Sequence, residues 1–184
     1  KTVTTPTIEV TTPVTYNGTA QKPTVVVKDG ANVILASEYS VSYENNTNAG
    51  AATVTITDVA GGNYNVSGST TFTIEKADYT NTVTKTVNLI KGRSTAQEGT
   101  LMAADFFTEE AVPEGAVISN VEDSFDEDVV KHLAFYQDAR KISYTSAENI
   151  TSAIDQTCTV TISSANYQDI KATLTFHPTD KETV

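Results

Sequence analysis

The stretch SYENNTNAGAATVTITDVAGGNYNVSGSTTFTIEK, residues 42–76, decides the fold. Apolar and polar residues alternate in two of its segments, residues 52–57 and 70–74, and a connection rich in Gly and Asn joins them. Alternation with a period of two is typical of a β-strand that buries one face. The stretch therefore predicts two strands linked by a turn-rich loop.

A weaker copy of this stretch returns about a hundred residues later. Four short matches recur in the same order: Ser42-Tyr43 with Ser143-Tyr144, TVTI at 53–56 with TVTI at 159–162, Asn63-Tyr64 with Asn166-Tyr167, and TFTI at 71–74 with TLTF at 173–176. The repeat predicts two domains of one kind, residues 1–78 and 79–184. The segment EKADYTN, residues 75–81, contains the predicted boundary.

Composition favours an all-β protein. Roughly one residue in six is threonine, and Trp is absent from the 184 residues. Thr and Val branch at Cβ, which restricts them in helices and suits a pleated sheet. Short apolar runs at 7–10, 24–28, 34–35, 39–43, 82–90, 116–121 and 141–145 alternate with turn signals, the pattern of a sandwich. In the run at 39–43, Tyr39, Val41 and Tyr43 are expected on one face.

Two segments keep alternative interpretations. Residues 99–107 form an apolar segment that fits a strand or a short helical turn. In residues 126–136, Val129, Val130, Leu133 and Tyr136 fit one helical stripe, with Asp126 as N-cap. We favour a strand there, because residues 137–140 then form a hairpin turn into the next strand.

The net charge of −11 makes nucleic acid and anionic membranes poor partners, since the chain lacks the Lys and Arg that such surfaces require. No apolar run reaches the ~20 residues of a membrane span. The single cysteine, Cys158, is predicted to be a small core residue rather than a nucleophile. The opening Lys1-Thr-Val-Thr resembles a cut through a longer protein.

A family resemblance rests on YNGTAQKP at 16–23, YSVSY at 39–43, NAG at 48–50, GNY at 62–64 and FTI at 72–74. In this order the motifs resemble the MBG-type bacterial Ig-like repeats over residues 6–78. The second half looks like the related companion modules that follow such repeats. The resemblance implies two tandem Ig-like β-sandwich domains in a secreted or wall-attached protein of Gram-positive, often gut, bacteria. The family offers no catalytic residues.

Candidate binding residues each have a plain structural explanation. The acidic residues Glu122, Asp123, Asp126, Glu127 and Asp128 are carboxylates that suit Ca²⁺, but their spacing does not match an EF-hand loop, so we expect a solvated loop. The two histidines, His132 and His177, lie far apart and lack metal-ligand spacing.

Aromatic and lysine side chains also have plain structural explanations. Tyr39, Tyr64, Tyr79 and Tyr167 suit a binding face, yet Tyr64 and Tyr167 share one repeat position, which favours a structural role. Lys22, Lys28 and Lys85 are candidates for a lysine–asparagine isopeptide bond, although no matching motif accompanies them.

These observations predict no catalytic, cofactor-binding or metal-binding residues, no cofactor and no enzymatic activity. A Trp-free chain is a poor sugar-cleaving enzyme, because sugar clefts use aromatic platforms. The expected function is an extracellular spacer, or stalk, of a larger bacterial cell-surface protein. The alternative is an adhesin module that binds host glycan or extracellular-matrix protein. The other expected partners are neighbouring domains of the same chain.

Overall fold

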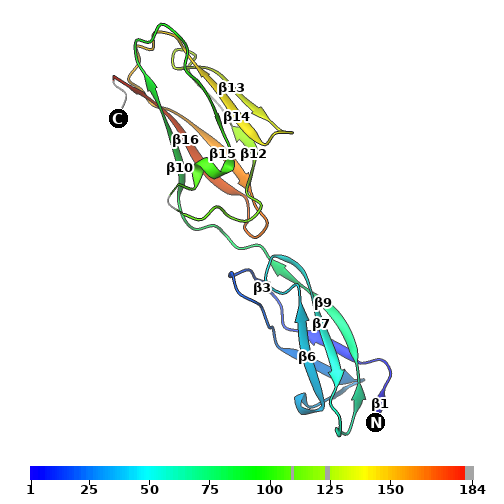
Figure 1. Ribbon diagram of the computed structural model, residues 1–184. Helices are drawn as coiled ribbons and strands as arrows, with labels where there is room; N and C mark the ends of the chain where they lie inside the picture. The colour runs from blue at the N-terminus through cyan, green and yellow to red at the C-terminus, as the bar shows by residue number, and fades with distance from the viewer. Residues whose placement is uncertain (109, 123–124, 181–184) are drawn as a thin grey trace. The chain divides into compact units, whose positions relative to one another are not determined.

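A computed structural model describes residues 1–108, 110–122 and 125–180 (Figure 1). The described part is all-β, with no α-helix and two short 3₁₀ helices. The chain divides into two compact units, Lys1–Ala77 and Asp78–Val184, called unit 1 and unit 2 below. Each unit contains a four-stranded and a three-stranded sheet, an arrangement consistent with a β-sandwich.

Unit 1 contains nine strands and one 3₁₀ helix. In chain order they are β1 (Thr2–Val3), β2 (Thr7–Val10), β3 (Val14–Thr15), β4 (Val25–Asp29), β5 (Asn32–Val33), η1 (Ala36–Glu38), β6 (Tyr39–Glu44), β7 (Gly50–Asp58), β8 (Asn65–Val66) and β9 (Gly68–Glu75). The four-stranded sheet has the order β3-β9-β7-β6, the three-stranded sheet has the order β2-β4-β5, and β1 pairs with β8. Residues from both larger sheets, such as Val27, Val54 and Phe72, form one core.

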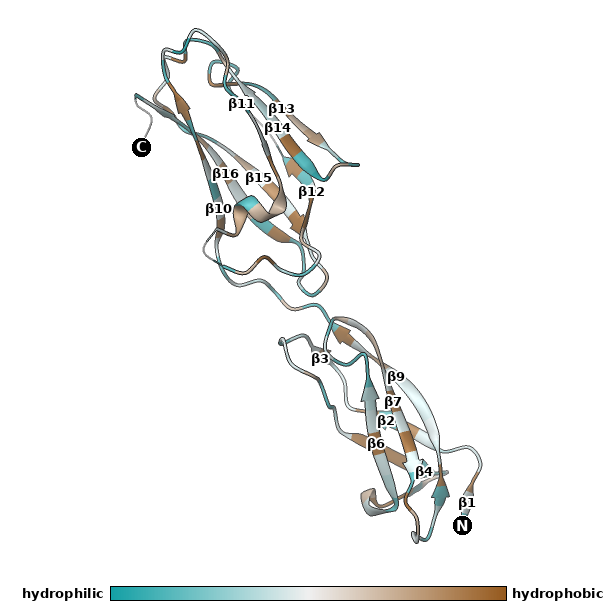
Figure 2. Ribbon diagram, viewed as in Figure 1, coloured by the Kyte–Doolittle hydropathy of each residue, from teal (hydrophilic) through white to brown (hydrophobic). Residues whose placement is uncertain are grey.

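The described residues of unit 2 form seven strands and one 3₁₀ helix. They are β10 (Val83–Ile90), β11 (Glu98–Leu101), η2 (Ala103–Phe106), β12 (Val117–Glu122), β13 (Val130–Tyr136), β14 (Lys141–Ser146), β15 (Gln156–Ser163) and β16 (Ile170–Thr179). Its sheets have the orders β10-β16-β15-β12 and β11-β14-β13. Ile118, Val160, Leu174 and Phe176 are fully buried in a core of their own. Figure 2 shows hydrophobic and hydrophilic residues alternating along these strands.

The two four-stranded sheets share one order of strand directions. In each sheet the strand that comes first in the chain, β3 or β10, runs parallel to the strand that comes last in the chain, β9 or β16. The remaining pairs are antiparallel. The register of the repeated motifs also matches, because Thr53 pairs with Thr71 in unit 1 and Thr159 with Thr173 in unit 2. The TVTI and TFTI matches therefore lie on equivalent strands.

The Ser-Tyr match in the proposed repeat is wrong. Ser42-Tyr43 lies on β6 of a four-stranded sheet, whereas Ser143-Tyr144 lies on β14 of a three-stranded sheet. The neighbour of β15 that corresponds to β6 is β12. A dipeptide on alternating strands occurs readily on either sheet, so it does not identify equivalent strands.

Other strand predictions are confirmed with small differences. Residues 99–107 contain both predicted alternatives, since β11 ends at Leu101 and η2 follows it. Residues 130–136 form strand β13, as favoured, after a turn at 127–129. The predicted strand at 34–35 is wrong, because β5 comprises Asn32–Val33 and pairs with β4 across a two-residue turn. Gly30, the first residue of that turn, has φ +61°, which glycine adopts without strain.

The predicted common face of Tyr39, Val41 and Tyr43 is buried only in part. Tyr39 is buried and Tyr43 is half-buried against the core, whereas Val41 is 37% exposed. Strand β6 is at the edge of its sheet, which leaves the middle of its length less covered.

Candidate functional site

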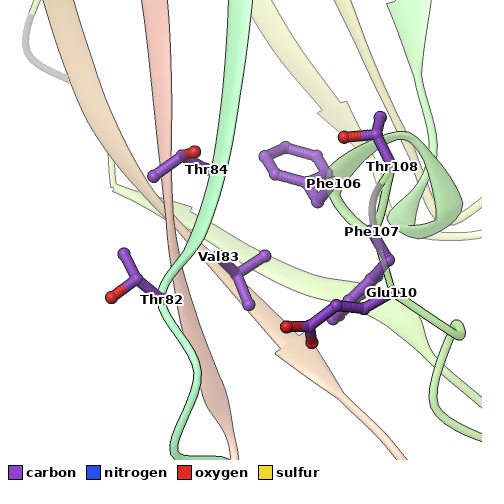
Figure 3. A pocket seen from close by; sticks show the side chains of 7 residues that line it. All are labelled: Thr82, Val83, Thr84, Phe106, Phe107, Thr108 and Glu110. Carbon is purple, nitrogen blue, oxygen red and sulfur yellow. The ribbon is translucent and has the colours of Figure 1, made fainter.

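A small hollow of about 190 Å³ lies in unit 2 between the start of β10 and η2 (Figure 3). Its lining consists of Thr82, Val83, Thr84, Phe106, Phe107, Thr108 and Glu110. Figure 3 shows the Phe106 ring and the Val83 side chain pointing into the space between the two elements, with the Glu110 carboxylate at its rim. Pockets for drug-sized ligands measure about 300–1,000 Å³, so this hollow is too small for one.

Local hydrogen bonds set the position of the two phenylalanines. The Met102 N–H donates to the Asp105 carboxylate at 2.7 Å, which caps the first turn of η2. The Phe107 N–H donates to the Ala104 carbonyl at 3.2 Å and closes that turn. Phe106 and Phe107 are then both buried, so neither ring is available as a sugar-stacking platform.

Glu110 fixes the segment that precedes β10. The Tyr79 hydroxyl donates to one Glu110 oxygen at 2.5 Å, and the Asn81 side-chain amide donates to the other at 2.7 Å. The Tyr79 ring meets Phe107 and Tyr167 edge-on, with ring centroids 5.8 and 5.1 Å apart. Desolvation first, and then the Glu110 hydrogen bond and charge, raise the pKa of Tyr79 to about 12. The same hydrogen bonds lower the pKa of Glu110.

The Glu110 carboxylate anchors the segment before β10 to the rest of unit 2. Both oxygens of Glu110 accept hydrogen bonds from unit 2 itself, and within the described lining Glu110 is the one carboxylate. Glycoside hydrolysis generally needs two carboxylates that face each other across the scissile bond. The described residues of the hollow do not provide that pair.

The acidic segment lies partly on a second hollow. Asp123 falls outside the described residues, whereas Glu127 and Asp128 line a hollow of about 520 Å³ together with Lys131, Glu148 and Asn149. Among residues the structure describes, no group of three His, Cys, Asp or Glu side chains is close enough to hold a metal ion. The Asp126 carboxylate instead accepts the Asp128 N–H at 3.1 Å, a local turn contact.

The histidines and the cysteine lie in separate places. His132 is exposed on β13, and His177 on β16 has its Nδ1 2.6 Å from an Asp155 oxygen. Cys158 is 7% exposed and belongs to the core of unit 2, which confirms its predicted position.

The four candidate tyrosines do not form one exposed face. Tyr39 is buried, and Tyr64 packs against the core of unit 1. Tyr79 and Tyr167 pack against the core of unit 2. The shared position of Tyr64 and Tyr167 thus has a structural role, as expected from the repeat.

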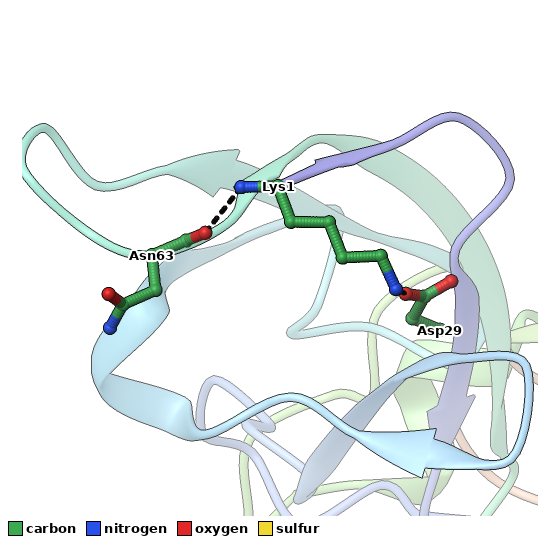
Figure 4. Close-up of polar contacts among 3 residues, drawn as sticks. All are labelled: Lys1, Asp29 and Asn63. Atoms are coloured by element: carbon green, nitrogen blue, oxygen red, sulfur yellow. Dashed lines mark hydrogen bonds and ion pairs between the residues drawn. The ribbon is translucent and has the colours of Figure 1, made fainter.

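The candidate lysines make surface contacts or lie on strands. Lys28 Nζ lies 2.7 Å from a Glu9 oxygen, Lys85 is on β10, and Lys22 borders an open hollow in unit 1. Near the start of the chain, Lys1 contacts the Asp29 carboxylate through Nζ and the Asn63 carbonyl through its amino group (Figure 4).

Sequence reasoning missed two functional carboxylates of the scaffold. Glu110 anchors Tyr79 and Asn81, and Glu38 accepts the Asn63 N–H at 2.5 Å. Both contacts join residues at least 25 positions apart, and no local motif marks them. The repeated dipeptide Asn63-Tyr64 and Asn166-Tyr167 was the one available signal for Glu38, whose carboxylate binds Asn63.

Comparisons with known proteins give a weak likeness to solved structures. No protein-family model and no curated protein matches the chain. An endo-fucoidan hydrolase of glycoside hydrolase family 107, MfFcnA4, is 13% identical, with a TM-score of 0.31 over 94% of this chain and 23% of that one. The human desmocollin-1 ectodomain is 14% identical, with a TM-score of 0.33 over 96% of this chain and 41% of that one.

Domains 4–9 of the surface layer protein SbsC are 13% identical, with a TM-score of 0.27 over 96% of this chain and 31% of that one. The chain thus spans less than half the length of each of these structures. Within the described residues, no helix is long and apolar enough to cross a membrane.

The comparisons contradict the prediction that the chain is not an enzyme. Three of the similar structures are endo-fucoidan hydrolases of glycoside hydrolase family 107. Domains with β-rich folds are shared by enzymes and non-enzymes, so composition and the lack of Trp do not decide this point. The likeness is too low to transfer any catalytic residue to this chain.

Proposed function

We propose that the chain is an extracellular spacer of a larger bacterial cell-surface protein, built from two tandem Ig-like β-sandwich domains. The first of these is of the MBG type over residues 6–78. The observation that carries the proposal is the parallel pairing of β1 with β8, just before β9 begins in unit 1, and of β10 with β16 in unit 2.

Parallel pairing determines where the chain enters and leaves a unit. When the first and last strands of a sheet run in the same direction, the start of one and the end of the other lie at opposite ends. A strand rises about 3.3 Å per residue, so the eight residues of β10 span roughly 26 Å. Each unit of this kind separates its two neighbours in the chain, which is what a spacer must do.

The anchored segment before β10 supports the same function. Tyr79 and Asn81 are fixed on unit 2 by Glu110, four residues after β9 ends at Glu75. Three residues, at positions 76–78, thus separate the last strand of unit 1 from the first of these anchored residues.

An adhesin module is the second candidate, and one observation favours it. Val33, the last residue of β5 in unit 1, is 59% exposed, and Leu35, two residues later, is 68% exposed. Aliphatic side chains so close together on a surface suit contact with a protein partner.

A binding array separates the two candidates. The 184-residue chain is applied to immobilised glycans and extracellular-matrix proteins, with and without Ca²⁺. A spacer gives no saturable binding. Saturable binding to one ligand class contradicts the spacer, and its loss in a Val33→Ser, Leu35→Ser variant assigns it to the exposed pair. A variant at Ile154, which is 71% exposed in unit 2, is the matched control.

A further inference from the structure

The first and last strands of unit 2 form one uninterrupted parallel pair. Its register runs from Val83 opposite Ala172 to Ile90 opposite Thr179, and the Lys91 N–H extends it by donating to the Thr179 carbonyl at 2.8 Å. The pair also lies on the core, because Val87, Leu89 and Phe176 are buried. Separating the two strands therefore breaks a long ladder and exposes apolar surface at once.

The first segment of unit 1 is divided among three partners. Strand β1 pairs with β8 over two positions, β2 with β4 over Thr7–Val10, and β3 with β9 at Val14 and Thr15. One further bond, from the Tyr16 N–H to the Glu75 carbonyl at 2.9 Å, extends the last pair. Pro6 and Pro13 lie between the three strands, and proline cannot donate to a ladder.

Tension along the chain loads the parallel pairs β1–β8, β3–β9 and β10–β16 in shear. In a parallel pair whose opposite ends are pulled, the strands must slide past each other, so all their hydrogen bonds resist together. A pair pulled from the same end instead opens one bond at a time. Unfolding under force is governed by the unfolding rate, which rises as fewer bonds share the load.

We propose that under tension unit 1 unfolds at a lower force than unit 2, so that unit 1 is the extensible part of the chain and unit 2 the part that holds. The use of this difference in a cell rests on the proposed spacer function, whereas the order of forces does not. Short pairs on three separate partners yield one after another in unit 1. The continuous β10–β16 pair must fail as a whole.

Single-molecule force spectroscopy on the whole chain, held at its two ends, tests this order. An unfolded chain extends by at most about 3.6 Å per residue. The 77 residues of Lys1–Ala77 and the longer Asp78–Val184 therefore release clearly different lengths and can be told apart. We expect the shorter length release at the lower force. Release of the longer length first, or equal forces, overturns the inference.

A change of pulling geometry tests the role of the β10–β16 pair without altering its strands. Asp169 is exposed and directly precedes β16, next to the end at which β10 begins. A handle on an Asp169→Cys variant, with the other at the chain start, peels the pair instead of shearing it, and the buried Cys158 stays unlabelled. We expect the unfolding force of unit 2 to fall by several-fold while that of unit 1 stays constant. An unchanged force for unit 2 contradicts the proposal.

A matched pair of proline variants gives a second test. The Lys91 N–H points to β16, whereas the Ile90 N–H donates to Gln97 Oε1 at 2.9 Å on the other side. Because N–H directions alternate along a strand, Lys85 donates towards β16 and Thr86 away from it. We expect Lys85→Pro to lower the force of unit 2 more than Thr86→Pro does. Equal effects of the two variants on the unfolding force would contradict the proposal. Protection of Cys158 from thiol reagents verifies that each variant is folded in the absence of force.

The two proposals fail in different experiments. A reversed order of forces overturns the shear inference and leaves the spacer intact, because a spacer needs only ends that lie apart. Saturable binding on the array removes the spacer and leaves the order of forces untouched.

Discussion

At the scale of single residues, one carboxylate holds a loop in each unit. In unit 1 Glu38, which directly precedes β6, accepts the Asn63 N–H at 2.5 Å, the Asn63 side-chain amide at 3.0 Å and the Tyr64 N–H at 3.3 Å. In unit 2 Glu114 precedes β12 and accepts the Asn166 side-chain amide at 3.5 Å. The Asn-Tyr repeat in the sequence thus corresponds to a repeated contact with an acid on an equivalent connection.

The Glu38 contact predicts a pH-dependent stability of unit 1. Hydrogen bonds from Asn63 lower the pKa of Glu38 below its ordinary value of 4.5. A lowered pKa means that the folded state binds the charged form better, so the stabilisation is complete above pH 4.5 and is lost as pH falls through the folded pKa. We expect Glu38→Gln to lower the unfolding midpoint of unit 1 at neutral pH and to differ less from the parent chain in acid.

Denaturant unfolding at several pH values measures this difference. Glu9→Gln is the control, because Glu9 makes an exposed contact with Lys28, and exposed ion pairs contribute little. The unfolding midpoint of Glu38→Gln should lie further below that of the parent chain at neutral pH than in acid. An equal difference at both pH values would contradict the role given to the Glu38 carboxylate.

At the scale of elements, the sequence predicts strands better than their partners. Alternation identified β7, β9, β15 and β16, and the TVTI and TFTI repeats carried even their register. The two-residue strands β1, β3 and β8 are too short for a periodic pattern to show. Alternation also gives a strand one buried face without saying which sheet it joins, which is why the Ser-Tyr match was misleading.

The candidate site was predictable to a smaller extent. Residue type and spacing correctly predicted that Cys158 lies in the core. They also predicted that the two histidines lie far apart. The hollow beside β10 depends instead on Glu110, which meets Tyr79 from 31 positions away. Contacts of this kind depend on the whole fold, so no local sequence pattern predicts them.

The anchored segment before β10 gives a prediction at this scale. Tyr79 has a pKa of about 12, so the folded state favours its neutral form, and this stabilisation is lost as pH rises from 10 towards 12. Tyr79→Phe keeps both ring contacts. We expect its unfolding midpoint to fall less than that of the parent chain as pH rises from 10 towards 12. Tyr79→Ala also loses two edge-on aromatic pairs, each of about 0.5–1.5 kcal/mol, and should be the less stable variant.

Absorbance of tyrosinate during alkaline titration, followed alongside unfolding, checks these expectations. The parent chain should show a tyrosine ionisation near pH 12 that Tyr79→Phe lacks. Tyr43 and Tyr144, whose pKa values burial also raises, should ionise alike in both chains. Tyr136, which is 48% exposed on β13, supplies the control variant. If Tyr136→Phe also lost the ionisation near pH 12, the assignment of that ionisation to Tyr79 would be wrong.

At the scale of the whole molecule, each unit has a core of its own. The buried core residues of unit 1 end at Ile74 and those of unit 2 begin at Val83. A domain of about 80 residues buries roughly 60% of the surface of its unfolded chain, which suffices for independent folding. The segment between the two cores contributes no buried core residue among those the structure describes.

We therefore expect residues 1–77 and 78–184 to fold as separate fragments, each with the unfolding midpoint that its unit has in the whole chain. Cys158 reports on unit 2 alone, because it is the single cysteine and is buried there. Its rate of reaction with a thiol reagent, measured against denaturant, should be the same in the fragment and in the whole chain. A fragment 1–77 that is unfolded by circular dichroism, or a Cys158 that reacts much faster in fragment 78–184, would mean that one unit depends on the other. Matching curves would mean that these two units are joined without loss of stability, the property that a spacer assembled from repeats requires.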